Sequence, residues 1–367
     1  MKRLLLFVLV LSAFVSCSKV NNVPRLVIIS LDGMRWQELF GGAQEELIAD
    51  TLFVPDVEGI KVAYWRETEK ERRELLFPFI WNFVPENGYI IGNRSLDSRM
   101  EVANEMWFSY PGYAEMFTGW ADDEHINNNN PKENPNTSIL EVINNDPRYR
   151  GSVMMLSSWE SIPYALGYKR GGFPASAGHE PCFVTNEKTI MLQGLDMGTK
   201  YMFDYSERSD VFTYGFALEV LKEKHPKVFY VAFGDTDMWP HEGKYDLYLQ
   251  SAQATDGYIR NIVETCEADP FYKGKTTYMI ITDHGRGRTA SSWTSHGRGC
   301  PGSNETWFMM FGKDVPVLGE TSNNGPFYNK QLAGTIAEVL DVDFTPDNGV
   351  KSKPFDPTHY EAPKNPL

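Results

Sequence analysis

The sequence predicts an α/β protein in which helices flank a central, mostly parallel β-sheet. Apolar runs of strand length recur along the chain, and most are continuous rather than alternating, which is typical of strands buried on both faces. The runs lie at residues 25–31, 89–92, 152–156, 227–233, 276–282 and 306–311. Segments with helical spacing lie between several of these runs, and strands that alternate with helices favour a parallel sheet.

Three helical segments carry clear signals. Thr68 and Glu71 form a capping box, apolar residues then recur at helical spacing as far as Phe83, and Pro78 is expected to kink that helix. The other two helices are expected within residues 248–264 and 331–340.

We expect one domain at residues 25–344, with insertions. The segments 41–61 and 159–210 have no regular pattern, so we expect long irregular loops or a cap there. The tail, residues 345–367, contains five prolines and is expected to run over the surface.

The N-terminus has the pattern of an export signal. Lys2 and Arg3 precede an apolar run, residues 4–15, that is too short to span a bilayer. The run ends in Val-Ser-Cys, and a small residue before Cys17 resembles a bacterial lipobox. We therefore expect residues 1–16 to be a lipoprotein signal peptide and residues 17–24 a short linker. The lipid on Cys17 would anchor a periplasmic or outer-membrane lipoprotein; the alternative is a secretory signal with an incidental Cys.

Charge and cysteine content narrow the possible partners. The net charge is −14, and an acidic protein repels a nucleic-acid backbone, so no nucleic-acid polymer is expected as a partner. An oxidising compartment permits one disulfide, for which Cys182 and Cys300 are the candidates. Cys266 lies on the apolar stripe of an expected helix and should be buried and unpaired.

Acidic residues and histidines follow three of the expected strands. They are Asp32 after 25–31, Asp237 and His241 after 227–233, Asp283 and His284 after 276–282, and His296 in the loop beyond. In an open α/β sheet the carboxyl ends of the strands are where sites form. Each motif alone has an ordinary explanation, such as a helix N-cap. Together, however, the carboxylates would repel one another unless a cation lies among them, and mixed Asp and His ligands suit zinc or a similar divalent ion.

Ser109 is the candidate nucleophile. It begins the run Ser-Tyr-Pro-Gly-Tyr, and Thr118-Gly119 follows nine residues later. A Ser in this position can be a plain N-cap. A hydroxyl at a helix N-terminus can also act chemically, because the free N–H groups there favour an attacking oxyanion and a bound phosphate.

These motifs, taken in order, resemble the alkaline phosphatase superfamily, and within it the type I phosphodiesterase or nucleotide pyrophosphatase branch. The motifs are Ser-Leu-Asp-Gly at 30–33, Ser-Tyr-Pro-Gly-Tyr at 109–113, Asp-x-x-x-His at 237–241, Thr-Asp-His-Gly at 282–285, and His296. They span most of the mature chain, and the resemblance implies an alkaline-phosphatase-like fold.

The resemblance also implies two divalent metal ions, which we expect to be zinc, with manganese or magnesium as alternatives. The implied ligands are Asp32, Asp283, His284 and Ser109 for one ion, and Asp237, His241 and His296 for the other. In that branch an Asn about twenty residues after the nucleophile holds the phosphoryl oxygens. Asn129 and Asn130 are the candidates here, with a solvated polar turn as the alternative reading.

Some residues depart from the family's patterns. The phosphodiesterase branch commonly has Thr as nucleophile and a His four residues later, where this chain has Ser109 and Tyr113. Sulfatases need an Arg where Tyr113 stands, so conversion of Ser109 to formylglycine is not expected. Arg286, Arg288 and Arg298 flank the metal loop and could hold a phosphate monoester.

We therefore expect a metal-dependent phosphoric ester hydrolase that forms a covalent phosphoserine. Its substrate would be a small-molecule phosphate ester, either a diester or a monoester. The alternatives are a sulfatase-like or phosphonate hydrolase of the same superfamily, and a non-catalytic metal-binding surface lipoprotein.

Overall fold

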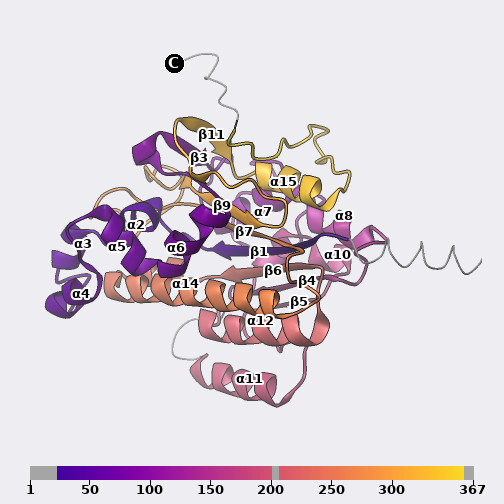
Figure 1. Ribbon diagram of the computed structural model, residues 1–367, viewed down its shortest axis with the longest axis horizontal. Coiled ribbons are helices and arrows are strands. Elements are labelled where there is room, and N and C mark those ends of the chain that lie inside the picture. The colour runs from indigo at the N-terminus through magenta and orange to yellow at the C-terminus, as the bar shows by residue number, and fades with distance from the viewer. Residues whose placement is uncertain (1–22, 201–205, 359–367) are drawn as a thin grey trace, which may run out of the picture.

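The computed structural model describes residues 23–200 and 206–358, and its centre is an eight-stranded β-sheet with helices on both faces (Figure 1). Across the sheet the strands are, in order, β10 (Gly319–Glu320), β2 (Gly88–Ile91), β9 (Phe308–Gly312), β7 (Thr276–Ile281), β1 (Arg25–Leu31), β6 (Val228–Phe233), β4 (Val153–Ser157) and β5 (Ala175–Ala177). Strand β9 is antiparallel to both of its neighbours, and the other pairs are parallel. The predicted α/β fold with a mostly parallel sheet is confirmed.

All six expected strands are present in this sheet. The strands that the sequence did not reveal are short and carry no apolar run: β5 is Ala-Ser-Ala and β10 is Gly-Glu. A second, three-stranded sheet was also not expected. It consists of β11 (Asn324–Tyr328), β3 (Ser98–Glu101) and β8 (Glu305–Thr306). Such short strands form because neighbouring strands satisfy their backbone groups, which a local pattern does not reveal.

The central strand β1 contributes side chains to two separate cores. Val27, Ile29 and Leu31 face one core, and Leu26 and Ile28 face the other. The helices α12 (Asp210–Lys224) and α14 (Tyr245–Ala268) cover the first face, and α7 (Ser109–Thr118) and α15 (Gln331–Leu340) cover the second (Figure 1). Every residue of β1 is buried, as a continuous apolar run predicts.

The other helices have 13 residues or fewer and lie mostly in the connections. They are α2 (Trp36–Gly41), α3 (Glu45–Ala49), α4 (Val57–Tyr64), α5 (Glu69–Leu76), α6 (Pro78–Asn87), η1 (Arg94–Leu96), α8 (Ile139–Asn145), α9 (Ile162–Ala165), α10 (Tyr168–Gly171), α11 (Glu187–Thr199) and α13 (Asp235–His241). The segments 41–61 and 159–210 were expected to be irregular, and this is wrong: the first contains α3 and α4, and the second contains α9, α10, β5 and α11. Packing rather than a long local pattern stabilises helices of this length.

Pro78 begins a helix instead of kinking one. The capping box of Thr68 and Glu71 starts α5 as expected, but α5 ends at Leu76 and Pro78 is the first residue of α6. A residue before proline is disfavoured in the helical conformation, and proline is tolerated in a first turn. The carboxylate of Asp256 on α14 accepts hydrogen bonds from the N–H groups of Phe79 and Ile80, at 2.8 and 2.9 Å, and so secures the new helix start.

Four sequence expectations concern the cysteines and the two ends of the chain. Cys182, Cys266 and Cys300 are free thiols, so the candidate disulfide between Cys182 and Cys300 does not form, whereas Cys266 is buried as expected. The tail is not wholly superficial, because Phe355 is buried in the core beside α15. The expected signal peptide and Cys17 lie outside the described residues. No helix in the described part of the chain is long and apolar enough to cross a membrane.

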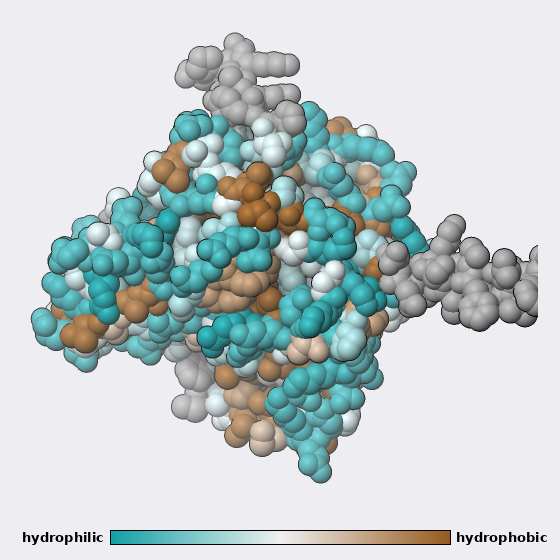
Figure 2. Space-filling view, in the orientation of Figure 1, coloured by the Kyte–Doolittle hydropathy of each residue, from teal (hydrophilic) through white to brown (hydrophobic). Residues whose placement is uncertain are grey.

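Helix α11 buries only one side. Leu192 packs against the core, whereas Ile190, Met191 and Leu195 are exposed. Figure 2 shows apolar side chains gathered at the foot of the view, where Figure 1 places α11, on a face that is otherwise mostly hydrophilic.

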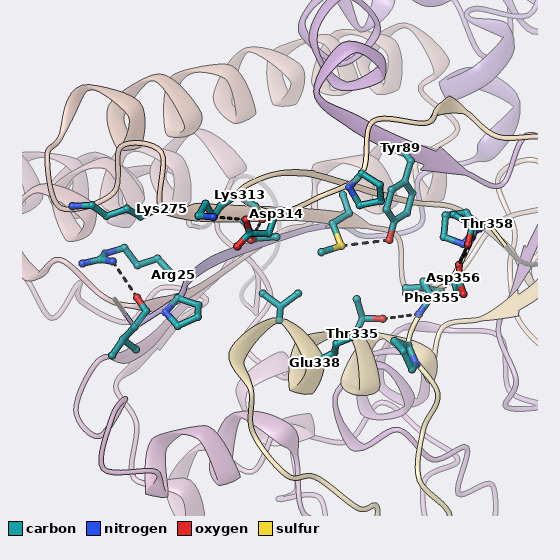
Figure 3. A pocket seen from close by; sticks show the side chains of 18 residues that line it. Arg25, Tyr89, Lys275, Lys313, Asp314, Thr335, Glu338, Phe355, Asp356 and Thr358 are labelled. Atoms are coloured by element: carbon teal, nitrogen blue, oxygen red, sulfur yellow. Dashed lines mark hydrogen bonds and ion pairs between the residues drawn. The ribbon is translucent and has the colours of Figure 1, made fainter. Parts of the chain in front are cut away.

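A cavity of about 770 Å³ opens at the amino-terminal edge of the sheet (Figure 3). Its walls come from the first residues of β1 and β7, the end of β9, helix α15 and the tail. The candidate metal ligands follow the carboxyl ends of the strands. This cavity is therefore separate from the candidate site.

Candidate metal centre

The candidate ligands meet where β7, β1 and β6, three neighbouring strands, end at one edge of the sheet. Asp32 directly follows β1, Asp283 and His284 follow β7, and α13 after β6 carries Asp237 and His241. The structure brings all six expected residues together in two groups, and within each group the ligand atoms lie within 4.8 Å of one another. The groups are Asp32, Asp283 and His284, and Asp237, His241 and His296.

The two groups differ in exposure. We call the first the buried group, because Asp32 is 4% exposed and Asp283 and His284 are 0% exposed. We call the second the open group, because the side chain of His241 is 50% exposed. A molecule arriving from solvent therefore meets the open group first.

Each of the three carboxylates has one oxygen held by a donor of the chain. Tyr113 donates its hydroxyl to Asp32 Oδ2 at 3.0 Å, and the N–H of Gly33 donates to Asp283 Oδ1 at 3.0 Å. The guanidinium of Arg286 donates to Asp237 Oδ1.

The opposite oxygens face the imidazoles. Asp32 Oδ1 lies 3.4 Å from His284 Nε2, and Asp237 Oδ2 lies 3.0 Å from His241 Nε2. Asp283 Oδ2 is buried without a hydrogen-bond partner and lies 3.5 Å from His284 Nε2. Because a carbonyl only accepts, the 2.9 Å contact of His284 Nδ1 with the Gly285 carbonyl places a proton on Nδ1, so Nε2 is the nitrogen that can bind a cation after losing its own proton.

This donor set fits divalent cations. A buried carboxylate oxygen without a partner is costly, and a cation would satisfy it. Each group combines carboxylate and imidazole ligands, which is the chemistry that zinc binds. The residues present therefore suit one ion per group.

The charges within the site shift its pKa values. Burial, and then the neighbouring carboxylates, raise the pKa of Asp32 and raise that of Asp283 well above its usual range. Burial lowers the pKa of His284, but Asp283, Asp32 and Asp237 outweigh it and raise the pKa to about 10. Cation binding at the buried group therefore competes with protons.

Asp237 behaves in the opposite way. Burial would raise its pKa, but Arg286, His296 and His241 outweigh burial and hold the pKa well below its usual range. Asp237 therefore remains a carboxylate, and its negative charge is already partly balanced by the chain.

Ser109 is the first residue of α7 and is 6% exposed. Its Oγ lies 3.2 Å from His284 Nε2 and 3.4 Å from Asp32 Oδ1, so the hydroxyl adjoins the buried group. A Cβ at Gly112 would lie 2.8 Å from the Asp283 carbonyl oxygen. Glycine at position 112 therefore allows α7 to lie directly against the end of β7.

A buried carboxylate organises the loop before Ser109. Glu115 accepts hydrogen bonds from the N–H groups of Ala103 and Asn104 and from the Asn104 side chain, at 2.7 to 3.0 Å. The side-chain oxygen of Asn104 in turn accepts from the N–H groups of Met106 and Trp107. Trp107 has φ of 55°, a conformation that a bulky residue rarely adopts without such support.

The two candidate asparagines are placed differently. Asn129 Oδ1 accepts a hydrogen bond from the N–H of Tyr110 at 3.0 Å, so Asn129 lies beside the first turn of α7. Asn130 donates its N–H to the side chain of Asn128 within the Asn-rich turn. Asn129 is therefore hydrogen-bonded to the helix that carries Ser109, whereas the hydrogen bond of Asn130 stays within the turn.

Several residues around the site differ from the sequence expectations. Arg286 is fully buried and bonds a candidate ligand, and Glu115 was not identified at all. Arg288 pairs with Glu305, and Arg298 pairs with Glu105. The sequence pointed to Tyr113 only because this residue departs from the family pattern. It pointed to Arg286 only because this residue directly follows the Thr-Asp-His-Gly motif.

Gly285 ends the Thr-Asp-His-Gly motif and lies in a crowded part of the backbone. It does not have a positive φ, but a Cβ there would lie 2.4 Å from the carbonyl oxygens of Gly302 and Glu305. Glycine at this position therefore serves a close backbone contact.

We expect Tyr113→Phe to weaken metal binding at the buried group by roughly tenfold, because loss of a hydrogen bond to a ligand typically costs 10–100-fold in affinity. The ring and its packing are retained, so the effect isolates the hydroxyl on Asp32. Competition with a chelator measures it. Tyr110→Phe is the matched control, because the Tyr110 hydroxyl donates to the Lys132 carbonyl. Equal affinity in Tyr113→Phe and wild type would contradict the role of this hydrogen bond.

Comparison with known proteins agrees with this geometry. A family model described as the metalloenzyme superfamily matches residues 168–302. No curated protein matches the chain by sequence. Among the solved structures similar to the chain is a protein in the alkaline phosphatase superfamily from Vibrio parahaemolyticus, with 12% identity and a TM-score of 0.52 over 88% of this chain and 67% of that chain. The alkaline phosphatase PafA has 8% identity and a TM-score of 0.59 over 90% of this chain and 98% of that chain. A putative sulfatase from Bacteroides thetaiotaomicron has 11% identity and a TM-score of 0.54 over 88% of this chain and 72% of that chain.

The matched segment contains Asp237, His241, Asp283, His284 and His296. At these identities the solved structures show the fold, which is the alkaline-phosphatase-like fold expected from the motifs. Members of the superfamily are metal-dependent hydrolases of phosphate or sulfate esters. The chain therefore has the alkaline-phosphatase-like fold, and its residues 168–302 match the model of the metalloenzyme superfamily.

Proposed function

We propose that this protein is a two-metal hydrolase of phosphate esters that acts through a covalent phosphoserine at Ser109. The observation that carries the proposal is the position of the Ser109 hydroxyl. It lies at the N-terminus of α7, 3.4 Å from Asp32 and 3.2 Å from His284. A hydroxyl between a cation site and the free N–H groups of a helix can become an oxyanion and attack a bound phosphate.

In the reaction, Ser109 Oγ loses its proton to solvent and forms a bond to phosphorus while the bond to the ester oxygen breaks. The ester oxygen takes a proton from solvent and leaves as the alcohol. Water then attacks the same phosphorus and releases Ser109. When bound, the ions act as Lewis acids that lower the pKa of the hydroxyl and balance the charge of the phosphoryl oxygens. Asp32, Asp283 and His284 would hold one ion, and Asp237, His241 and His296 the other.

Asn129 is the candidate for holding a phosphoryl oxygen. Its amide oxygen accepts from the Tyr110 N–H, which fixes the side chain beside the first turn of α7. The amide NH₂ is then the part of Asn129 that a substrate would meet. The position of Asn130 gives this role less support, since its N–H bonds within the turn.

The arrangement of the arginines favours a phosphodiester substrate. A monoester carries two negative charges and usually needs a further cation. Arg286 is buried on Asp237, and Arg288 bonds Glu305, so neither guanidinium is directed to Ser109. Arg298 is exposed and pairs with Glu105. A diester, with one charge and two organic groups, is the better match, and a sulfate or phosphonate ester is the alternative within the superfamily.

We further propose that the enzyme acts outside the cytoplasm, anchored by lipid at Cys17. The support is the sequence pattern of an apolar run that ends in Val-Ser-Cys. Labelling with a radioactive fatty acid, with Cys17→Ser as the control, tests this proposal.

We expect about two divalent ions per chain, preferably zinc, because each group offers a complete set of donors. Affinity should rise with pH, since Asp32, Asp283 and His284 must lose protons whose pKa values the site raises. Elemental analysis and titration at several pH values measure both quantities. Protein that stays free of metal after zinc loading would refute the centre.

We expect Ser109→Ala to lower turnover by on the order of a thousandfold or more while fold and metal content persist. The covalent step needs the Ser109 oxygen, whereas the ions keep their Asp and His ligands. Ser322→Ala, at an exposed serine, is the control. Turnover near the wild-type level in Ser109→Ala would place the nucleophile elsewhere.

We expect kcat/KM for an aryl phosphodiester to exceed that for the matched monoester, because no cation of the metal loop is directed to the phosphate. Parallel assays of aryl diester, monoester, phosphonate and sulfate with zinc present measure the preference. A diester-to-monoester ratio well below one would reject it. If Arg298→Ala then removed monoester turnover selectively, Arg298 would be the cation that binds the second charge.

A further inference from the structure

We propose that Arg286 is a positioning residue that holds Asp237 as a one-oxygen ligand of the ion in the open group and thereby keeps that ion four-coordinate. The inference rests on the proposed function only for its two-ion centre, not for the ester that is hydrolysed. It concerns how many oxygens of Asp237 bind the ion, which the identity of the six candidate ligands does not determine.

The first support is the division of the Asp237 oxygens. Arg286 Nη1 donates to Oδ1, whereas Oδ2 lies 3.0 Å from His241 Nε2. A carboxylate with one oxygen held by a guanidinium presents the other oxygen to a cation. The open group consists of Asp237, His241 and His296, which are three protein ligands. Asp237 Oδ1 lies 3.7 Å from His296 Nε2, but it is the oxygen that Arg286 holds, so Oδ2 is the oxygen left for a cation. Zinc sites that act on substrates typically have three protein ligands and one open position.

The second support is the way in which Arg286 itself is held. Its side chain is 0% exposed, Nε donates to the Trp293 carbonyl at 3.1 Å, and Nη2 donates to the Thr294 carbonyl at 2.5 Å. Trp293 is fully buried and packs edge-on against Phe53 and Tyr245. The guanidinium is therefore fixed by backbone that is anchored in the core.

These contacts also link the two segments that supply the open group. Asp237 and His241 belong to α13, whereas Trp293 and Thr294 lie three and two residues before the loop residue His296. A planar guanidinium can bond three acceptors in fixed directions, which an ammonium group on a flexible stem cannot reproduce. Arg286 thus fixes the orientation of Asp237 relative to His296.

The room for this contact comes from Gly33. A Cβ at position 33 would lie 2.3 Å from Asp237 Oδ1 and 3.2 Å from Arg286 Nη1. Gly33 has φ of 58° and donates its N–H to Asp283. The residue after Asp32 therefore leaves the space in which Asp237 and Arg286 meet.

A crystal structure of zinc-loaded wild-type protein tests the inference directly. We expect Asp237 Oδ2 at about 2.0–2.2 Å from the ion of the open group and Oδ1 outside bonding distance, still bonded to Arg286. Two Asp237 oxygens at bonding distance from that ion would overturn the proposal. This measurement needs no variant and no substrate.

Cobalt(II) titration of variants provides the second test, since four-coordinate cobalt(II) absorbs visible light more strongly than five- or six-coordinate cobalt(II). In Arg286→Gln we expect a weaker band for the open-group ion and a 10–100-fold loss of affinity for it. Arg286→Lys, which keeps the charge, should restore affinity in part but not the band. Arg288→Gln, two residues away and bonded to Glu305, is the matched control and should keep the wild-type spectrum.

The outcomes separate this inference from the proposed function. If Arg286→Gln folds less stably but its cobalt spectrum equals that of wild type, Arg286 is merely structural and the inference fails. If no ester is hydrolysed, or Ser109→Ala stays active, the coordination result still decides the role of Arg286. If the variant does not fold, the zinc-loaded wild-type structure decides alone.

Discussion

The repulsion among three carboxylates at one edge of the sheet is the constraint on which the site depends. Asp32, Asp237 and Asp283 follow neighbouring strands, and burial of the first and third raises their pKa values. Carboxylates in such a place need positive charge or donors close by. The chain provides donors for one oxygen of each, from Tyr113, Gly33 and Arg286, and the opposite oxygens can be balanced by cations.

The same constraint explains why Ser109, the proposed nucleophile, is held so firmly. Ser109 must lie beside the buried group, and α7 reaches it because Gly112 permits contact with the end of β7. The loop before Ser109 is tied to α7 through Glu115 and Asn104. A catalytic hydroxyl that is positioned before substrate arrives does not have to be ordered during the reaction, which lowers the entropic cost of the step.

Some strands and site residues were predictable from the sequence, and others were not. Residues 25–31 and 276–282 were recognised as buried strands because an apolar run of strand length is a local property, and the ligands followed because strand ends converge. Strand β5, with its sequence Ala-Ser-Ala, carries no such signal. The break at Pro78 was located correctly, but its outcome depended on Asp256 of a distant helix.

The sequence by itself determined the fold class, the six candidate ligands and the serine beside them, because these depend on local patterns and on their order along the chain. Only the tertiary structure decided which oxygen of each carboxylate is held by Tyr113, Gly33 or Arg286, since these donors lie 81, 250 and 49 residues from their acceptors in the chain. It also decided that Arg286 is buried and bonds Asp237, a candidate ligand. Contacts between residues so far apart leave no periodic signal, because they depend on the way in which the strands bring distant segments together.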